Sequence, residues 1–108
     1  MTASDPFALG GRQDDAPPSL STLARERQEL VARWRQAPSG GYPEDEAAVI
    51  SGAQRMIERR INLAPPASLA DVAIKLRTVI ETVEAGFDLA DDDMDALRQC
   101  LAFAEAGA

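Results

Sequence analysis

Residues 61–77 read Ile-Asn-Leu-Ala-Pro-Pro-Ala-Ser-Leu-Ala-Asp-Val-Ala-Ile-Lys-Leu-Arg, and this stretch decides the fold. Pro65 and Pro66 end one helix, because proline lacks the N–H group that a helix interior requires. Ser68 then offers an N-cap for the next helix, with Asp71 three residues later as a variant of the capping box. Apolar residues follow at every third or fourth position, which predicts a buried helix face. That face carries Leu69, Val72, Leu76, Val79 and Val83.

A first helix is predicted well before this stretch. It begins at Ser19 or Ser21, either of which is a suitable N-cap, and runs to about Gln36. Residues 37–43 contain two prolines and a glycine pair, so they end the helix. One face has apolar residues at helical spacing, and Arg27 is its only charged member. The members of this face are Leu20, Leu23, Arg27, Leu30 and Trp34.

Two further helices are predicted from their ends. One begins at Glu44, where three successive carboxylates suit the positive end of a helix dipole, and Pro65 and Pro66 end it. Its predicted apolar face consists of Val49, Ile50, Ala53, Met56, Ile57 and Ile61. Gly86 is a suitable C-terminal stop for the helix that Ser68 begins. A last helix begins at residues 91–93. It is expected to bury a face made of Met94, Leu97, Leu101 and Ala104.

These segments predict the all-α class. Short loops join antiparallel neighbours, so the expected fold is a small antiparallel helical bundle of three main helices and a shorter fourth. Residues 19–108 form the single expected helical domain. Residues 1–18 are expected to be a flexible, disordered tail, because Phe7 and Leu9 are their only sizeable apolar side chains.

The net charge of −7 argues against nucleic-acid binding. Residues 65–108 carry three basic and nine acidic residues, a sum of −6, and no segment has a basic surplus to neutralise phosphates. No apolar run approaches the roughly 18 residues that span a bilayer, and the N-terminus lacks the pattern of a signal peptide. Cys100 is the only cysteine, which excludes an intramolecular disulfide. We therefore expect a cytoplasmic protein that binds neither nucleic acid nor membrane.

Residue types that carry catalysis are scarce. The chain has no histidine, so Cys100 lacks the usual base, and we expect no catalytic residue and no cofactor. The aspartate-rich tract 88–95 suggests calcium, but a calcium loop from Asp91 requires glycine at its sixth position and glutamate at its twelfth. Ala96 and Ala102 occupy those positions. The tract is therefore interpreted as the charged start of a helix, and no metal is expected.

Lys75 and Arg77 flank Leu76 on opposite shoulders of the predicted buried face. At 100° per residue they point about 200° apart, so they cannot hold one anion together. Each has a carboxylate four residues away, Asp71 and Glu81 respectively, which predicts local ion pairs. A serine activated by Lys75 stays open as a catalytic arrangement. The same pattern predicts that Leu76→Ala destabilises the fold more than Lys75→Ala does.

The segment 61–77 also resembles a recurrent pattern in small uncharacterised proteobacterial proteins, many of them carried on phage or other mobile elements. That pattern has an isoleucine, then Pro-Ala-x-Thr/Ser-Leu, then Lys-Leu-Arg, after an earlier helix with a tryptophan near its end. The family often has glycine where this chain has Asp71. The resemblance covers about residues 20–85 and implies an accessory protein with no established activity. The matching residues are Ile61, Pro66-Ala67, Ser68-Leu69, Lys75-Leu76-Arg77 and Trp34.

These features predict a non-enzymatic protein-interaction or regulatory accessory protein, one form of which is an acidic inhibitor that covers a basic partner surface. The alternative is a small-molecule or anion binder that uses a groove between helices. A thin core of about ninety residues also favours a homodimer. In the second helix, Val49, Met56 and Leu63 lie seven residues apart beside the buried face. Together with Trp34, they are the predicted partner-binding residues.

Overall fold

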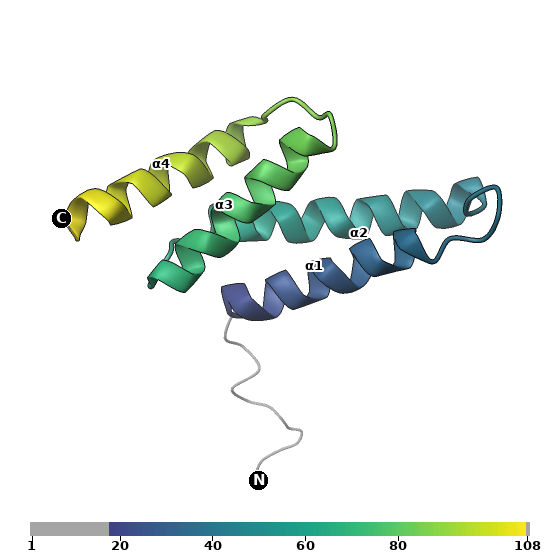
Figure 1. The fold of residues 1–108 in the computed structure, drawn as a ribbon, viewed down its shortest axis with the longest axis horizontal. Coiled ribbons are helices and arrows are strands. Elements are labelled where there is room, and N and C mark those ends of the chain that lie inside the picture. The colour runs from purple at the N-terminus through teal and green to yellow at the C-terminus, as the bar shows by residue number, and fades with distance from the viewer. Residues whose placement is uncertain (1–17, 108) are drawn as a thin grey trace, which may run out of the picture.

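The computed structural model describes residues 18–107, and within them it contains four α-helices and no strand (Figure 1). The all-α prediction is thus confirmed. The predicted shorter fourth helix is wrong, because the last helix has the same 16 residues as the first and third. The predicted flexible tail lies outside the described residues, apart from Pro18. The helices are α1 (Leu20–Arg35), α2 (Glu44–Leu63), α3 (Leu69–Glu84) and α4 (Asp91–Ala106).

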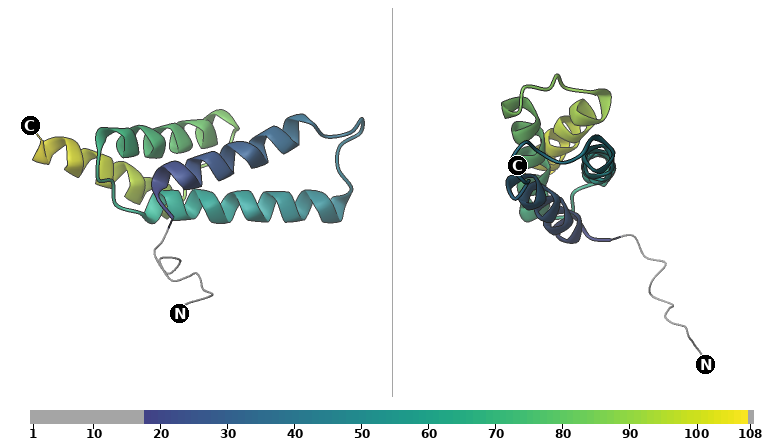
Figure 2. Two further views of the ribbon diagram at one scale, coloured as in Figure 1. Left: turned by 90° about the horizontal axis from the view of Figure 1, so that it is seen from below. Right: turned by 90° about the vertical axis from the view of Figure 1, so that its right-hand side faces the viewer.

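The four helices form two hairpins. Helices α1 and α2 lie side by side and run in opposite directions, and α3 and α4 form a second pair (Figure 1). Helix α3 also contacts α1 and α2, and α4 contacts α2. The left view of Figure 2 places α3 along one outer edge of the molecule, with no other helix beyond it. One face of α3 is therefore turned away from the other helices.

Local signals set the helix starts. Ser19 Oγ accepts a hydrogen bond from the backbone N–H of Thr22, and Ser68 Oγ accepts one from that of Asp71, so both predicted N-caps are confirmed. Asp71 Oδ2 in turn accepts from the N–H of Ala67 at 2.9 Å, one residue earlier than a capping box would place it. These side chains satisfy donors that the first helical turn leaves without partners.

A Schellman motif ends α3. The N–H of Phe87 donates to Thr82 O at 3.2 Å, and the N–H of Gly86 donates to Val83 O at 2.9 Å. Gly86 has φ 91°, in the left-handed region that disfavours a side chain. The predicted stop at this glycine is confirmed, and the turn it makes returns the chain toward α4.

Gly86→Ala is expected to lower the free energy of unfolding by about 1–2 kcal/mol, because alanine is strained at this backbone conformation. Gly52→Ala is the matched control. Gly52 lies in α2, and a methyl group added there would meet no neighbouring atom within 4 Å, so alanine should raise stability by about 0.5–1 kcal/mol. Urea denaturation measures both. Equal effects of the two substitutions would contradict the role assigned to Gly86.

The apolar core lies where α1, α2 and α3 meet. Leu20, Leu23 and Ile61 are buried at its centre, and half-buried apolar residues pack around them. Those residues are Ile57, Ala64 and Ile74. The predicted buried face of α1 is confirmed at Leu20 and Leu23. The apolar face predicted for α2 is only partly right, because Ile50 and Ile61 are buried but Val49 and Met56 are exposed.

The predicted buried faces of α3 and α4 are largely wrong. In α3, Val79 is buried, but Leu69, Leu76 and Val83 are exposed while the polar residues Lys75 and Thr78 are buried. The predicted face of α4 is likewise exposed at Met94, Leu101 and Ala104. The buried residues of α4 are Asp93, Ala96 and Cys100.

The physical reason is that both helices turn polar side chains inward to partners on α1 and α2. Periodicity identifies the most apolar face of a helix. It does not identify the face that a neighbouring helix requires, because that choice depends on groups far away in the sequence.

Candidate functional site

Lys75 is the largest fully buried side chain, with 0% of its surface exposed. It reaches from α3 to the C-terminal end of α2, where the last carbonyl groups of a helix lack partners within the helix. Its Nζ donates hydrogen bonds to the backbone oxygens of Ile61, Asn62 and Ala64, at 2.7, 2.9 and 2.5 Å. The ammonium group therefore caps α2 from another helix. Burial lowers the pKa of Lys75 below its ordinary value.

Arg27 is a second buried cation, and it ties α1 to α2 and α3. Its Nε donates to Glu58 Oε2 at 2.9 Å, and its Nη1 donates to Glu81 Oε1 at 2.5 Å. Gln54 Nε2 also donates to Glu58 Oε2, at 3.0 Å. Burial by itself lowers the pKa of Arg27, but the hydrogen bonds and charges of Glu81 and Glu58 outweigh burial and raise it. The guanidinium group thus stays charged and paired.

The local ion pairs predicted for α3 are therefore wrong. Glu81 pairs with Arg27, and no ion pair among the described residues involves Arg77. Asp71, the predicted partner of Lys75, instead accepts the hydrogen bond that begins α3. Lys75 therefore binds carbonyl groups of α2 and not its neighbour in the sequence, Asp71. A buried cation requires several well-placed acceptors, which one carboxylate on the same helix cannot supply.

Asn62 ties α2 to the start of α4. It is buried, and its Nδ2 donates to Asp92 Oδ2 and Asp93 Oδ1, each at 2.8 Å. Asp93 Oδ2 accepts from the N–H of Ala90 at 2.9 Å, so this carboxylate also caps α4. Among the described residues, no donor lies within hydrogen-bond distance of the buried Asn62 Oδ1.

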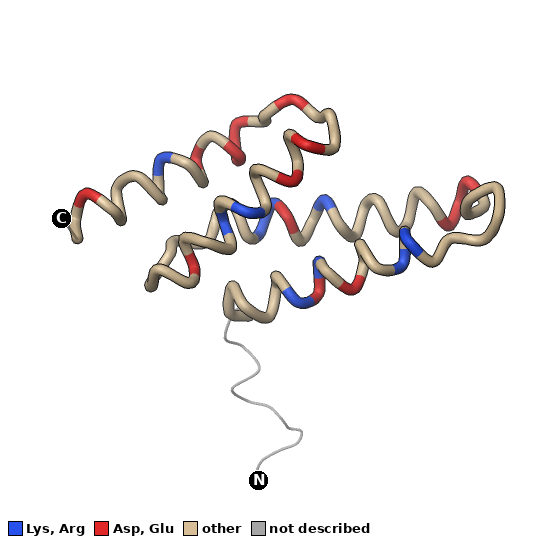
Figure 3. The backbone as a smooth tube through the Cα atoms, in the orientation of Figure 1, with Lys and Arg blue, Asp and Glu red and all other residues tan. Residues whose placement is uncertain are grey.

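A groove of about 660 Å³ is lined in part by the residues that make these hydrogen bonds around Arg27 and Asn62. Arg27, Glu58, Asn62 and Asp93 contribute polar groups to it, and its apolar lining includes Trp34, Met56 and Phe87. Figure 3 shows that acidic residues gather around the α3–α4 connection and the start of α4, which border the groove. Arg27 already contacts two carboxylates, whereas Arg55 and Arg59, which also line the groove, belong to no ion pair among the described residues. The lining as a whole has three arginines and five carboxylates, a net charge of −2, which disfavours an anion.

The four predicted partner-binding residues differ in their surroundings. Trp34 is half-buried and meets Tyr42 edge to face, with ring centroids 5.8 Å apart, and it lines the groove with Met56. Val49, Met56 and Leu63 are exposed on α2. Gly52 and Arg60 occupy the positions between them on this face, so the apolar surface of α2 is interrupted.

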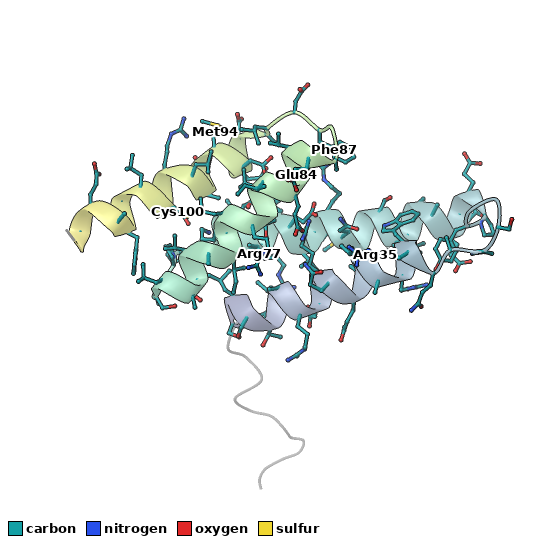
Figure 4. All side chains as sticks on the ribbon, viewed as in Figure 1. Arg35, Arg77, Glu84, Phe87, Met94 and Cys100 are labelled. Atoms are coloured by element: carbon teal, nitrogen blue, oxygen red, sulfur yellow. The ribbon has the colours of Figure 1, made fainter. Side chains whose placement is uncertain are left out.

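Helix α3 carries a longer apolar surface, three of whose residues, Leu69, Leu76 and Val83, the sequence pattern placed on the predicted buried face. We call it the α3 stripe, and it is exposed along its whole length. Figure 4 marks its far end at Phe87, just beyond α3. Ile80, near its middle, is 54% exposed, and Leu69 at its start is 76% exposed. The stripe consists of Leu69, Ala73, Leu76, Ile80, Val83 and Phe87.

The thiol of Cys100 and the acidic side chains are the remaining candidates for a chemical role. Cys100 is buried, and burial raises the pKa of its thiol. In residues 18–107, no three carboxylate, thiol or imidazole side chains gather so that they could hold a metal ion. No helix in the same range combines the length and the apolar composition needed to cross a membrane.

Comparisons with protein-family models, with curated proteins and with solved structures find no match.

Proposed function

We propose that this chain is a non-enzymatic protein-interaction module that docks another protein chain on the α3 stripe. The observation that carries the proposal is the outward position of an unbroken apolar face at the edge of the fold. Exposed apolar surface of this kind is a feature of protein-interaction sites. The paired state of the buried ionisable groups supports the non-enzymatic part, since Arg27 and Lys75 are engaged in joining helices.

The alternative, a small-molecule or anion binder, receives less support. The groove has the size of a ligand site, but its lining has five carboxylates against three arginines. An anion placed there would meet Arg55 and Arg59, but it would also face Glu58, Asp92 and Asp93. A cytoplasmic location remains part of the proposal and is supported by the single, buried cysteine.

A photo-crosslinking amino acid at Ile80 tests the proposed function in cells that express the full chain. Illumination should yield covalent adducts of this chain with a protein, because the side chain at Ile80 projects from the stripe. The same group at Arg98, which is exposed on α4, is the control and should give at least about tenfold less adduct. Equal labelling from both positions, or none from Ile80, would contradict docking on α3.

A further inference from the structure

The α3 stripe has the spacing of a helix-pairing seam. Its members are separated by four, three, four, three and four residues. This alternation is the heptad pattern by which two helices pack side chains into each other along their length. At 100° per residue the positions within α3 fall within about 80° of one another around the helix. The stripe is therefore narrow and straight, as a single partner helix requires.

The stripe lies opposite the face that α3 uses inside its own fold. Thr78, which is buried, points about 160° away from Ile80, and the buried Lys75 points about 140° away from it. The contacts with α1, α2 and α4 therefore leave the stripe open. A partner helix can pack along it with no change in the contacts that hold the fold together.

Two charged residues flank the stripe on the same side, one heptad apart. Arg77 and Glu84 are both exposed on α3 (Figure 4), and no ion pair among the described residues involves either one. Two copies of α3 packed in opposite directions would bring Arg77 of one copy to Glu84 of the other, twice over. A parallel pair would place Arg77 beside valines of the partner copy instead. The charges therefore favour the antiparallel arrangement.

We propose that the partner on the α3 stripe is a second copy of this chain, packed antiparallel about a two-fold axis near Ile80. This inference rests on the proposed function and names its partner. A two-fold contact requires a surface that complements itself. The apolar seam and the Arg77–Glu84 flank both meet that requirement. The buried seam supplies the association energy, and the two reciprocal ion pairs set its direction.

This contact differs from the predicted dimer, which would pair the first and second helices of the two copies. The exposed apolar residues of α2 are seven residues apart and separated by Gly52 and Arg60, whereas the α3 stripe has an apolar residue at every seam position. Met56 is 68% exposed, so it serves as a matched control for Ile80. A glutamate at either position adds the same charge to an exposed apolar site.

Sedimentation equilibrium on the full chain tests the proposal by mass. The natural chain should sediment as a dimer, and Ile80→Glu should weaken association at least about 100-fold, because two carboxylates would be buried at the centre of the contact. Met56→Glu should leave the dimer intact. Far-UV circular dichroism checks that both variants keep their helices. If Met56→Glu dissociates the dimer and Ile80→Glu does not, the contact lies on α2 and the proposal is overturned.

A charge-reversal cycle tests the direction of packing. Arg77→Glu or Glu84→Arg alone should weaken the dimer on the order of tenfold, since each places like charges opposite one another twice. The double variant should restore the natural affinity, because it rebuilds both pairs with the signs exchanged. Additive losses in the double variant would overturn the antiparallel arrangement.

Disulfide trapping gives an independent geometric test in a Cys100→Ser background. Ile80→Cys should form a disulfide-linked dimer under mild oxidation, because residue 80 lies near the axis and faces its own copy. Leu69→Cys should not, because the antiparallel arrangement separates the two copies of residue 69. Trapping at both positions indicates a parallel pair and overturns the proposal. A monomer at every concentration also overturns it, while adducts with a different protein in the photo-crosslinking experiment would still support the proposed function.

Discussion

Lys75→Met should lower the free energy of unfolding by about 2–4 kcal/mol. Methionine keeps much of the aliphatic length of lysine but cannot donate to the carbonyl groups of Ile61, Asn62 and Ala64. Each buried acceptor left without a partner costs about 1–3 kcal/mol, and partial rearrangement reduces the sum. Urea denaturation followed by circular dichroism measures the loss. The Ile80→Glu background removes any contribution from association.

Leu76→Ala is the control for Lys75→Met, since the two residues are adjacent in α3. Leu76 is 36% exposed and lies on the α3 stripe, so its truncation in the same background should cost less than about 1 kcal/mol. This order is the reverse of the one that the sequence pattern predicted. A larger loss for Leu76→Ala than for Lys75→Met would mean that the buried face of α3 is assigned wrongly.

Arg27→Met should be the most destabilising single substitution, with a loss of about 3–5 kcal/mol. The substitution removes the cation that faces Glu58 and Glu81 and leaves two negative charges close together, one of them with a side chain only 14% exposed. Thermal unfolding should show a lower midpoint at neutral pH.

The triple variant Arg27→Met, Glu58→Gln, Glu81→Gln separates charge from packing. Neutral amides do not repel one another, so this variant should recover a measurable part of the stability lost in Arg27→Met. No recovery would indicate that the aliphatic part of Arg27, rather than its charge, stabilises the contact between α1, α2 and α3.

The hydrogen bonds of Lys75 and Arg27 and the outward position of the α3 stripe depend on the same orientation of α3. Lys75 fixes this helix to the end of α2, and Arg27 fixes it through Glu81 to α1. Together these contacts set the rotation of α3 about its own axis. That rotation turns the apolar stripe outward. A variant that breaks either tie is therefore expected to weaken association as well as stability.

The sequence by itself determined the four helices and most of their ends, although not the length of α4. Pro65 and Pro66 separate α2 from α3, Ser68 caps α3, and Gly86 ends it, because each signal acts within a few residues of the backbone it controls. Periodicity also identified the buried Leu20 and Leu23 of α1. In α2 it identified the buried Ile50 and Ile61, but it placed the exposed Val49 and Met56 on the same face. Arg27 could be recognised as unusual, since it was the one charge on an otherwise apolar face, but its partners were 31 and 54 residues away.

Only the tertiary structure decided which faces of α3 and α4 are buried. The most apolar face of α3 is exposed because Lys75 and Thr78 point inward, and Lys75 does so to satisfy carbonyl groups that α2 leaves open at its end. A helix has several faces that can be buried, and local periodicity ranks them by apolarity alone. The free energy of the whole fold also counts unpaired backbone groups and buried charges, whose partners lie on other helices. The outward α3 stripe could therefore be located only once those partners were in place.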